Sequence, residues 1–300
     1  MKHKKILLTI LTLALTFTLM GCSLLTRADV LYESPSTYEQ LRIDMIAEVE
    51  PSVVAVITET GHGSGTIFKS ELVTSEDPEE VIEEGLTTYY ILTNYHVVED
   101  GGEMKVHFGV GQDDIYVMDY QGYEPYDIAV VRIQTTRVLR VHHVGPIDDN
   151  TVTEIIKGQD VFAIGSPQDL DKFNYVTSGV VSLVTYAYNN VSNLALMHDA
   201  ELNPGNSGGA LINTKGELIG INTAIMTSSG QYEGFSFAVP SNLARKVVTD
   251  LMEYGAVQRG WMGVEISSVT NQLAEERRLP SVATLRPSSS FPLIVSVHQV

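Results

Sequence analysis

A serine set among glycines is the part of this sequence best suited to chemistry. Residues 205–209 read GNSGG and lead directly into the apolar run 210–212. A serine on such a tight turn can act as a nucleophile, but its hydroxyl needs a neighbouring base and a group that orients the base. The turn's N–H groups, at Gly205, Asn206 and Ser207, can stabilise the negative oxygen of a tetrahedral intermediate. Five residues also fit an ordinary glycine-rich hairpin turn, so the interpretation depends on partners elsewhere in the chain.

Two candidate partners precede the serine, each beside a strand-like apolar run. The first run begins at Tyr90 and is expected to be a strand that ends in His96, while Asp127 opens the run 128–133. The order His, Asp, Ser is that of chymotrypsin-type barrels and differs from the order in subtilisins and α/β-hydrolases. The three residues therefore predict a catalytic triad, in which His96 takes the proton of Ser207 and Asp127 fixes the imidazole tautomer.

Four further stretches carry a resemblance to a known family. They are GSGTIF at 63–68, AIGSP at 163–167, VTSGVVS at 176–182 and GINTAI at 220–225. With the three residues above, they make the chain closely resemble the HtrA/Deg family of bacterial trypsin-like serine proteases, from about Val49 to about Val264. The resemblance implies a serine endopeptidase that acts on unfolded or damaged extracytoplasmic proteins. It also implies a homotrimer, and no metal or organic cofactor.

Short β-rich runs from Pro51 onward predict an all-β fold of two six-stranded antiparallel barrels, as in trypsin. The first barrel would contain the runs 53–58, 64–68, 89–93, 104–110, 115–120 and 127–133, and the second 160–166, 175–184, 193–198, 209–213, 217–226 and 235–239. No strand alternates with a long helix, which disfavours a parallel α/β fold. The resemblance places His96 and Asp127 on the first barrel and Ser207 on the second, with the active site in the cleft between them.

Two helices are expected to flank the barrels. A helix over 241–254 has Ser241 as a cap, apolar residues on one face and Gly255 as its stop. A shorter helix is expected over 39–49. The protease domain is thus expected at 39–256, with barrels at about 50–140 and 146–240.

The first 21 residues are expected to be a lipoprotein signal peptide. Lysines within residues 2–5 form a basic start, and the uncharged run 6–20 suits a signal-peptide core better than a membrane span. The run ends in Leu-Met-Gly-Cys, which resembles a bacterial lipobox and makes Cys22 the lipidated residue of a membrane-anchored, extracytoplasmic protein. The alternatives, an ordinary secretory signal or an uncleaved anchor, also export the chain. Residues 22–38 are expected to be a tether.

Composition narrows the partners and cofactors. Among 300 residues, 19 Lys+Arg against 37 Asp+Glu give a net charge of −18, which argues against nucleic-acid binding. Cys22 is the only cysteine, so no intrachain disulfide forms and no thiol is left for catalysis. The remaining histidines lack metal-ligand spacing, apart from the weak adjacent pair His142 and His143. The acidic run 76–84 is interpreted as a solvated loop, with a regulatory or oligomer contact as the alternative.

Residues near the serine are expected to bind substrate. They are Glu201, Leu202, Asn203, Ile221, Asn222, Thr223 and Ala224. If Glu201 enters the primary specificity pocket, cleavage should follow Lys or Arg. If Glu201 faces solvent, which is our expectation, Ile221, Thr223 and Ala224 form a small apolar pocket that favours Val, Ala or Ile. Asn206 carries no charge that a freed N-terminus must neutralise, so activation by N-terminal clipping is not expected.

The C-terminal residues 257–300 resemble the start of a truncated PDZ domain. The residues WMGV at 261–264 resemble the loop that holds a peptide's terminal carboxylate. A PDZ domain needs about 80–90 residues, and the roughly 40 that follow are too few for an independent core. We expect the chain from about Ser267 to be poorly ordered, through an interrupted PDZ region or as a natural short form whose strand at 291–297 docks on the protease body. Peptide-switched activity is then not expected.

The competing hypothesis for function is a non-catalytic surface lipoprotein that binds misfolded chains. The joint presence of His96, Asp127 and Ser207 argues against it, because binding alone requires none of them.

Overall fold

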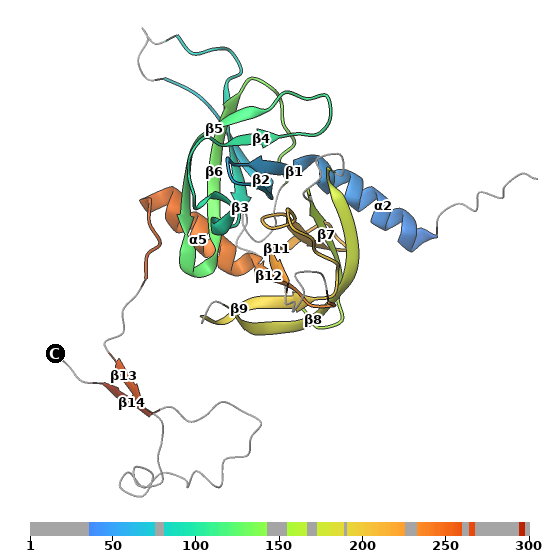
Figure 1. The fold of residues 1–300 in the computed structure, drawn as a ribbon, viewed down its shortest axis with the longest axis vertical. Coiled ribbons are helices and arrows are strands. Elements are labelled where there is room, and N and C mark those ends of the chain that lie inside the picture. Colours follow the sequence, from blue (N-terminus) through green and yellow to red (C-terminus); the bar gives the residue numbers. More distant parts are fainter. Residues whose placement is uncertain are drawn as a thin grey trace, which may run out of the picture.

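Two closed antiparallel barrels form the body of the molecule (Figure 1). The computed structural model describes residues 36–75, 81–142, 155–166, 173–188, 191–225, 233–259, 264–267 and 294–297. Each barrel has six strands, in the order β1-β2-β3-β6-β5-β4 in the first and β10-β11-β12-β9-β8-β7 in the second. The expected fold class, a trypsin-like pair of barrels followed by a helix, is confirmed.

The strands follow the apolar runs of the sequence closely. Those of the first barrel are β1 (Val53–Ile57), β2 (His62–Leu72), β3 (Thr87–Thr93), β4 (Lys105–His107), β5 (Ile115–Tyr123) and β6 (Ile128–Thr135). Those of the second are β7 (Asp160–Gly165), β8 (Tyr175–Tyr188), β9 (Val191–His198), β10 (Ala210–Asn213), β11 (Leu218–Ile225) and β12 (Ser236–Pro240). Every predicted run contains a strand, although β2 is longer than its run and β4 is shorter.

Strands such as β1 and β10 are apolar almost throughout because both of their faces are buried. In β1, for example, Val54 and Val56 point into the interior of the first barrel, whereas Val53 belongs to a core that both barrels share. This shared core takes Phe68 and Leu92 from the first barrel and Phe162, Ile164, Ile212 and Val239 from the second. A third cluster fills the second barrel. The shared core therefore fixes how the two barrels sit against each other.

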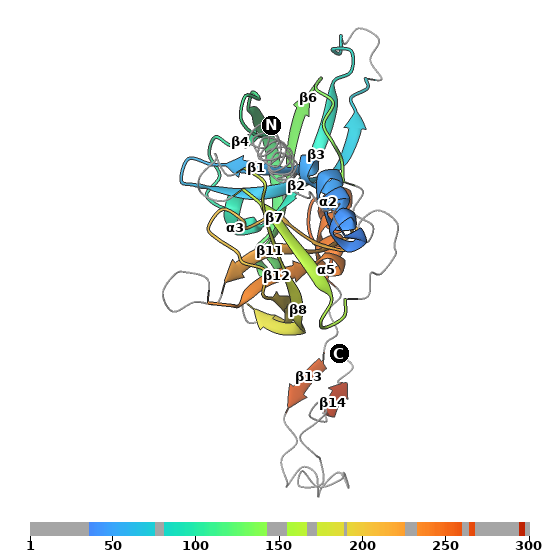
Figure 2. The ribbon, with the colours of Figure 1, turned by 90° about the vertical axis from the view of Figure 1, so that its right-hand side faces the viewer.

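Two longer helices cover the shared core (Figure 2). Helix α5 (Ser241–Tyr254) buries Val247 and Leu251 and ends at Gly255, whose φ of 70° suits a left-handed C-cap. Its N-cap is Pro240 and not the expected Ser241, which is the first helical residue and is buried.

Helix α2 (Thr37–Val49) starts two residues before the predicted range, because the hydroxyl of Ser36 accepts a hydrogen bond from the Glu39 N–H at 3.1 Å and caps the helix. Helix α2 buries Met45 and Val49.

The structure corrects the expected position of His96. Strand β3 ends at Thr93, and His96 lies in the next element, the one-turn helix α3 (Tyr95–Val98). Asn94 breaks the strand: its side-chain amide donates to the Asp127 carbonyl at 2.8 Å, so the chain turns towards the residue that His96 must meet. Asp127 itself precedes β6 and follows the 3₁₀ turn η2 (Glu124–Tyr126).

Near the C-terminus, β13 (Val264–Ser267) and β14 (Ile294–Val297) pair as an antiparallel two-stranded sheet. Figures 1 and 2 both show this sheet apart from the barrels. The predicted strand at 291–297 contains β14, which pairs with β13. Poor order of the chain from about Ser267 stays a prediction.

Several predictions concern residues outside the described ones. These are the signal peptide with Cys22, the tether up to residue 35, acidic residues 76–80, and most of the PDZ-like segment. Within the described ranges, none of the helices has the length and apolar character needed to cross a membrane.

Candidate active site

His96 and Asp127 form a hydrogen-bonded pair on the first barrel. The Nδ1 atom of His96 lies 2.9 Å from Asp127 Oδ2 and 3.0 Å from Oδ1, and the backbone N–H of His96 donates to Oδ1 at 3.0 Å. Asp127 is almost fully buried and adopts a left-handed conformation with φ of 53°, which aspartate tolerates better than most residues. A buried carboxylate on Nδ1 requires the proton on that nitrogen, which leaves Nε2 free to accept another.

The surroundings of His96 act on the pKa of its imidazole in opposite directions. Burial of the imidazole by itself lowers the pKa of His96, because it penalises the charged ring. The hydrogen bond and charge of Asp127 act in the opposite direction, with a smaller contribution from Glu99, and the net pKa of His96 lies above its usual value. The imidazolium that forms on proton transfer is thus stabilised in place.

Ser207 lies on the second barrel, in the turn that leads into β10. Its hydroxyl donates to the carbonyl of Thr223 at 3.0 Å. The hydroxyl of the same Thr223 donates to Asp127 Oδ2 at 2.5 Å. One residue of β11 therefore contacts both Ser207 and Asp127, and it brings the three residues predicted from the sequence to one place where the barrels meet.

The backbone of the serine turn is held by short-range hydrogen bonds. The Asn206 N–H donates to the Asn203 carbonyl at 3.0 Å, and the Gly208 N–H donates to the Asn222 carbonyl at 2.8 Å. Among the described residues, no backbone acceptor faces the N–H groups of Gly205 and Ser207. Of the three N–H groups expected to bind the oxyanion, that of Asn206 is thus engaged within the turn.

Most of the residues predicted to bind substrate are buried, and Glu201 is exposed. Leu202 and Ile221 are buried in the cores, and Asn222 is buried with its amide donating to the Ala210 carbonyl at 2.8 Å. Glu201 is exposed, and its Oε1 accepts from the Asn203 amide at 3.1 Å. Thr223 serves the contacts described above, and the side chain of Ala224 lies outside the described ones.

Sequence reasoning missed two supporting residues, Asn94 and Ser64. The Asn94 amide holds the Asp127 carbonyl, and the Ser64 hydroxyl donates to the Gly205 carbonyl at 2.6 Å. Ser64 lies between two glycines in the stretch 63–68, one of those that carried the family resemblance. The resemblance pointed to this stretch but not to the role of Ser64. Both residues act on backbone carbonyls far away in the chain, so no local pattern reveals their function.

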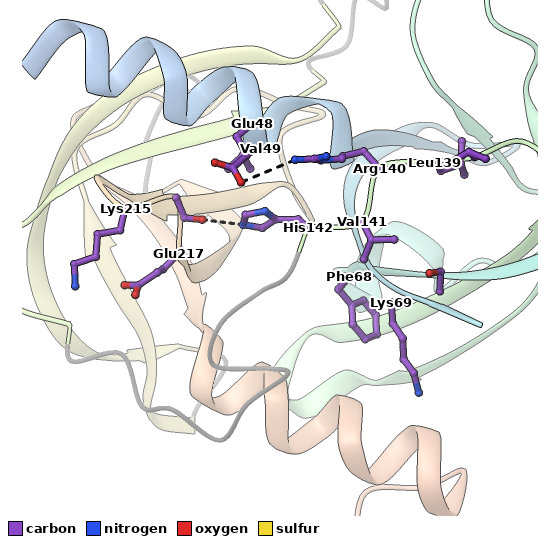
Figure 3. Close-up of a pocket in the computed structure, with 13 residues that line it drawn as sticks. Glu48, Val49, Phe68, Lys69, Leu139, Arg140, Val141, His142, Lys215 and Glu217 are labelled. Carbon is purple, nitrogen blue, oxygen red and sulfur yellow. Dashed lines mark hydrogen bonds and ion pairs between the residues drawn. The ribbon is translucent and has the colours of Figure 1, made fainter. Parts of the chain in front are cut away.

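A cavity of about 940 Å³ lies away from these residues (Figure 3). It is lined by the end of α2, the segment 138–142 that follows the first barrel, and the β10–β11 turn. His142 Nε2 donates to the Gly216 carbonyl at 2.8 Å. Arg140 Nη2 forms an ion pair with Glu48 Oε1 at 3.9 Å. The cavity therefore belongs to the junction between the barrels and not to the candidate site. The described part of the chain also holds no group of three potential metal ligands.

Comparisons with known proteins show the family of the chain. Residues 63–221 match the model of the trypsin-like peptidase domain, a range that includes His96, Asp127 and Ser207. The chain is 37% identical over 210 residues to the periplasmic serine endoprotease DegP of Salmonella typhimurium, and 35% identical over 209 residues to that of Escherichia coli K12. Each alignment covers 67% of this chain and 42% of the relative, so the chain spans about two fifths of the length of these relatives.

Solved structures give the same result. The HtrA-type protease AlgW with decapeptide matches with a TM-score of 0.62 at 26% identity, covering 87% of this chain and 78% of that one. The same protease with tripeptide matches with a TM-score of 0.62 at 31% identity, covering 81% and 72%. The chain belongs to the trypsin-like peptidase family, and its relatives there are HtrA-type serine proteases.

Proposed function

We propose that the chain is a serine endopeptidase with Ser207 as nucleophile, His96 as general base and acid, and Asp127 as the residue that orients His96. One observation carries the proposal: Asp127 binds Nδ1 of His96 while Thr223 ties the same carboxylate to the Ser207 hydroxyl. Membership of the trypsin-like peptidase family supports it.

Catalysis begins when the Ser207 side chain rotates from the Thr223 carbonyl to His96 Nε2. Ser207 Oγ then bonds to the peptide carbonyl carbon as its proton passes to His96, and His96 later gives that proton to the leaving amine. The N–H groups of Gly205 and Ser207 bind the oxyanion, each lowering the barrier by about 3–4 kcal/mol. Water, deprotonated by His96, then hydrolyses the acyl-enzyme.

A fluorophosphonate probe tests this function, because only a serine activated by its base reacts rapidly. We expect the wild type to be labelled at Ser207 and to degrade casein. Ser207→Ala should lose both properties, and His96→Ala nearly so, since triad members act as a unit. Thermal melts should show all three proteins folded. An unlabelled, folded wild type would favour the competing hypothesis of a binding protein without catalysis.

For substrates, we propose unfolded or damaged proteins outside the cytoplasm. Support comes from relatives that are named periplasmic endoproteases and from AlgW structures that contain peptides. Casein and a reduced, unfolded protein should be degraded much faster than the same protein in its native state. Equal rates on folded and unfolded forms would contradict this substrate class.

For the residue before the scissile bond, we propose a preference for small apolar side chains such as Val, Ala or Ile. Glu201 is exposed and its carboxylate already accepts from Asn203, which favours a position outside the primary pocket. A peptide library should show the same preference in the wild type and in Glu201→Ala. Strong selectivity for Lys or Arg that disappears in the variant would show that Glu201 reads the substrate.

We also propose a homotrimer that is anchored to the membrane through Cys22. Helix α2 supports the assembly, because Tyr38, Leu41 and Ile43 are large apolar residues that are 45–60% exposed on this chain. Sedimentation of the protein without its first 22 residues should give a trimer that Leu41→Glu dissociates, and a wild-type monomer at micromolar concentration would contradict it. Labelling of cells with a fatty-acid analogue should depend on Cys22, as Cys22→Ala would show.

A further inference from the structure

A single buried hydroxyl joins the first barrel to the serine turn of the second. Ser64, on β2, is fully buried, and its Oγ donates to the Gly205 carbonyl at 2.6 Å. The same oxygen accepts from the Ser166 N–H at 2.7 Å. Both partners lie on the second barrel, more than 100 residues further along the chain. The hydroxyl therefore donates to one backbone group and accepts from another, and a shift of the Gly205 carbonyl would break the first of these bonds.

The backbone of Ser64 holds the same turn at a second point. Its N–H donates to the Ser207 carbonyl at 2.7 Å, and its own carbonyl accepts from the Thr93 hydroxyl at 2.7 Å. The carbonyls of Gly205 and Ser207 thus both end on one residue of the other barrel. Thr93 in turn holds Ser64 in place from β3.

These contacts fix the peptide planes on both sides of the unit that carries the Ser207 N–H. The plane that joins residues 205 and 206 is held at its carbonyl by Ser64 and at its N–H by Asn203. The plane that joins residues 207 and 208 is held at its carbonyl by Ser64 and at its N–H by Asn222. Because peptide units are planar, the unit between them, which carries the Ser207 N–H, has little freedom left.

The turn needs this support because glycines flank the nucleophile. Gly205 and Gly208 have φ of 99° and 86°, and glycine passes between such conformations at little cost. The fit is also tight: a Cβ on Gly208 would lie 2.1 Å from the Ser64 carbonyl oxygen, and one on Gly165 would lie 3.0 Å from Ser64 Oγ. Removal of the hydroxyl would leave two buried backbone groups unpaired, the Gly205 carbonyl and the Ser166 N–H, and rotation of the Gly205 peptide is the simplest way to relieve the first of them.

We propose that Ser64 is a positioning residue for the oxyanion hole: it holds the carbonyls of Gly205 and Ser207 so that the N–H groups of the turn aim at the developing oxyanion. The inference rests on the proposed function and extends it to the first barrel. On this view the first barrel supplies the base, His96, and its orienting carboxylate, Asp127. Through Ser64 it also holds the oxyanion hole of the second barrel in place.

Ser64→Ala tests the role, with Ser52→Ala as a matched control. Ser52 is equally buried and its hydroxyl also donates to a backbone carbonyl at 2.6 Å, that of Val49, but it does not contact the serine turn. We expect Ser64→Ala to lower kcat by about 10- to 100-fold with KM nearly unchanged, since the lost interaction matters mainly in the transition state. Ser52→Ala should also lose stability, although less because one buried group loses its partner instead of two, and it should keep wild-type kcat.

Two further measurements separate positioning from a merely structural effect. The affinity for a peptide boronate, whose adduct with Ser207 places an oxygen in the oxyanion hole, should fall in parallel with kcat/KM in Ser64→Ala. The acid limb of the pH–rate profile should stay in place, because His96, Asp127 and Glu99 are untouched. Ser64→Cys, with a similar size and a weak donor, should give intermediate values, and it replaces Ser64→Ala if that variant does not fold.

Three results would overturn the role of Ser64. They are wild-type kcat and boronate affinity in a folded Ser64→Ala or Ser64→Cys, losses of kcat that Ser52→Ala shares, or a shifted acid limb that places the defect at His96. Failure of the proposed function itself looks different, because the wild type would then neither react with fluorophosphonate nor turn over substrate.

Discussion

The side chain of Thr223 bonds to Asp127 across the boundary between the two barrels. Its hydroxyl donates to Asp127 Oδ2 from β11, while its carbonyl accepts from the Ser207 hydroxyl. Thr223 is almost fully buried, so water does not compete for either contact. Thr223 thus holds the Ser207 hydroxyl in its resting position, and it also donates a hydrogen bond to Asp127, the carboxylate that orients His96.

Thr223→Val should therefore impair chemistry more than binding. The variant keeps the shape and the carbonyl but removes a donor to a buried carboxylate, a hydrogen bond of the charged class worth about 1.5–3 kcal/mol. We expect kcat to fall by about 10- to 100-fold. Thr223→Ser keeps the hydroxyl and should retain most of the activity. Steady-state kinetics on a peptide substrate measure both, and equal activity of the Val and Ser variants would show that the bond has no catalytic weight.

The sequence was sufficient to predict the two barrels and to single out His96, Asp127 and Ser207, which form the proposed triad. Strands such as β1 and β6 are short apolar runs between turn residues, and their burial on both faces leaves a strong signal. The one-turn helix that carries His96 left none, because four residues from Tyr95 to Val98 are too few for a helical period. That element is set by Asn94 and by tertiary contacts.

Hydrogen bonds between residues far apart in the chain likewise could not be predicted from the sequence. Ser64 and Gly205 are 141 residues apart, and Thr223 and Asp127 are 96 apart, so their pairing follows only once the barrels are assembled. Thr223 illustrates the limit: its neighbourhood indicated a place near the serine, but not that its hydroxyl binds Asp127.

Activity should fall in acid as His96 becomes charged. The neutral imidazole is the base, and the net effect of Asp127 and Glu99 raises its pKa against the opposing effect of burial. The acid limb of kcat/KM should thus have its midpoint above about 6.5, the value of a free histidine. Glu99→Gln removes one negative charge without touching the site, so it should move the limb to lower pH and leave the plateau unchanged. A limb that stays in place in Glu99→Gln at low ionic strength would contradict this.

Stability should also fall in acid, through a different histidine. His198 on β9 is buried, both of its ring nitrogens lack a partner within the described residues, and burial lowers its pKa to about 4 against an opposing effect of Asp199. The unfolded chain binds the proton near pH 6.5, so the folded state loses stability as pH drops from there towards 4. The full difference is on the order of 3 kcal/mol.

His198→Leu isolates this contribution, because carboxylates destabilise both proteins alike in acid. Urea unfolding at pH 7 and pH 4 gives the free energy of unfolding of each protein. We expect the wild type to lose about 2–3 kcal/mol more than His198→Leu over this interval. Parallel losses would mean that His198 titrates normally in the folded protein.

The last prediction concerns Arg259, which follows α5. Its guanidinium carbon lies 5.1 Å from the ring centroids of both Tyr123 and Tyr126, and the two rings meet edge to face at 5.3 Å. Tyr123 directly precedes the 3₁₀ turn η2, and Tyr126 is its last residue, directly before Asp127. The segment that carries Arg259 is fixed by Asp250, whose carboxylate accepts from the Gln258 N–H at 2.8 Å. Arg259 therefore braces the outer side of the turn that delivers Asp127 to His96.

Arg259→Ala should lower the free energy of unfolding by about 1 kcal/mol, the range of exposed cation–π contacts, and reduce kcat by about two- to fivefold. Arg259→Lys keeps the charge and should recover part of both. In a double-mutant cycle with Tyr126→Leu, the contact should give a coupling energy of about 0.5–1 kcal/mol. Both Arg259 variants keep the hydrogen bond from Gln258 to Asp250. Asp250→Asn weakens that bond and leaves Arg259 in place. A similar loss of stability and kcat in Asp250→Asn would therefore be a general effect of loosening this segment. Additive effects of Arg259→Ala and Tyr126→Leu would show that the ring contacts do not stabilise the turn, and unchanged kcat in Arg259→Ala would show that Asn94 and Thr223 suffice to hold Asp127.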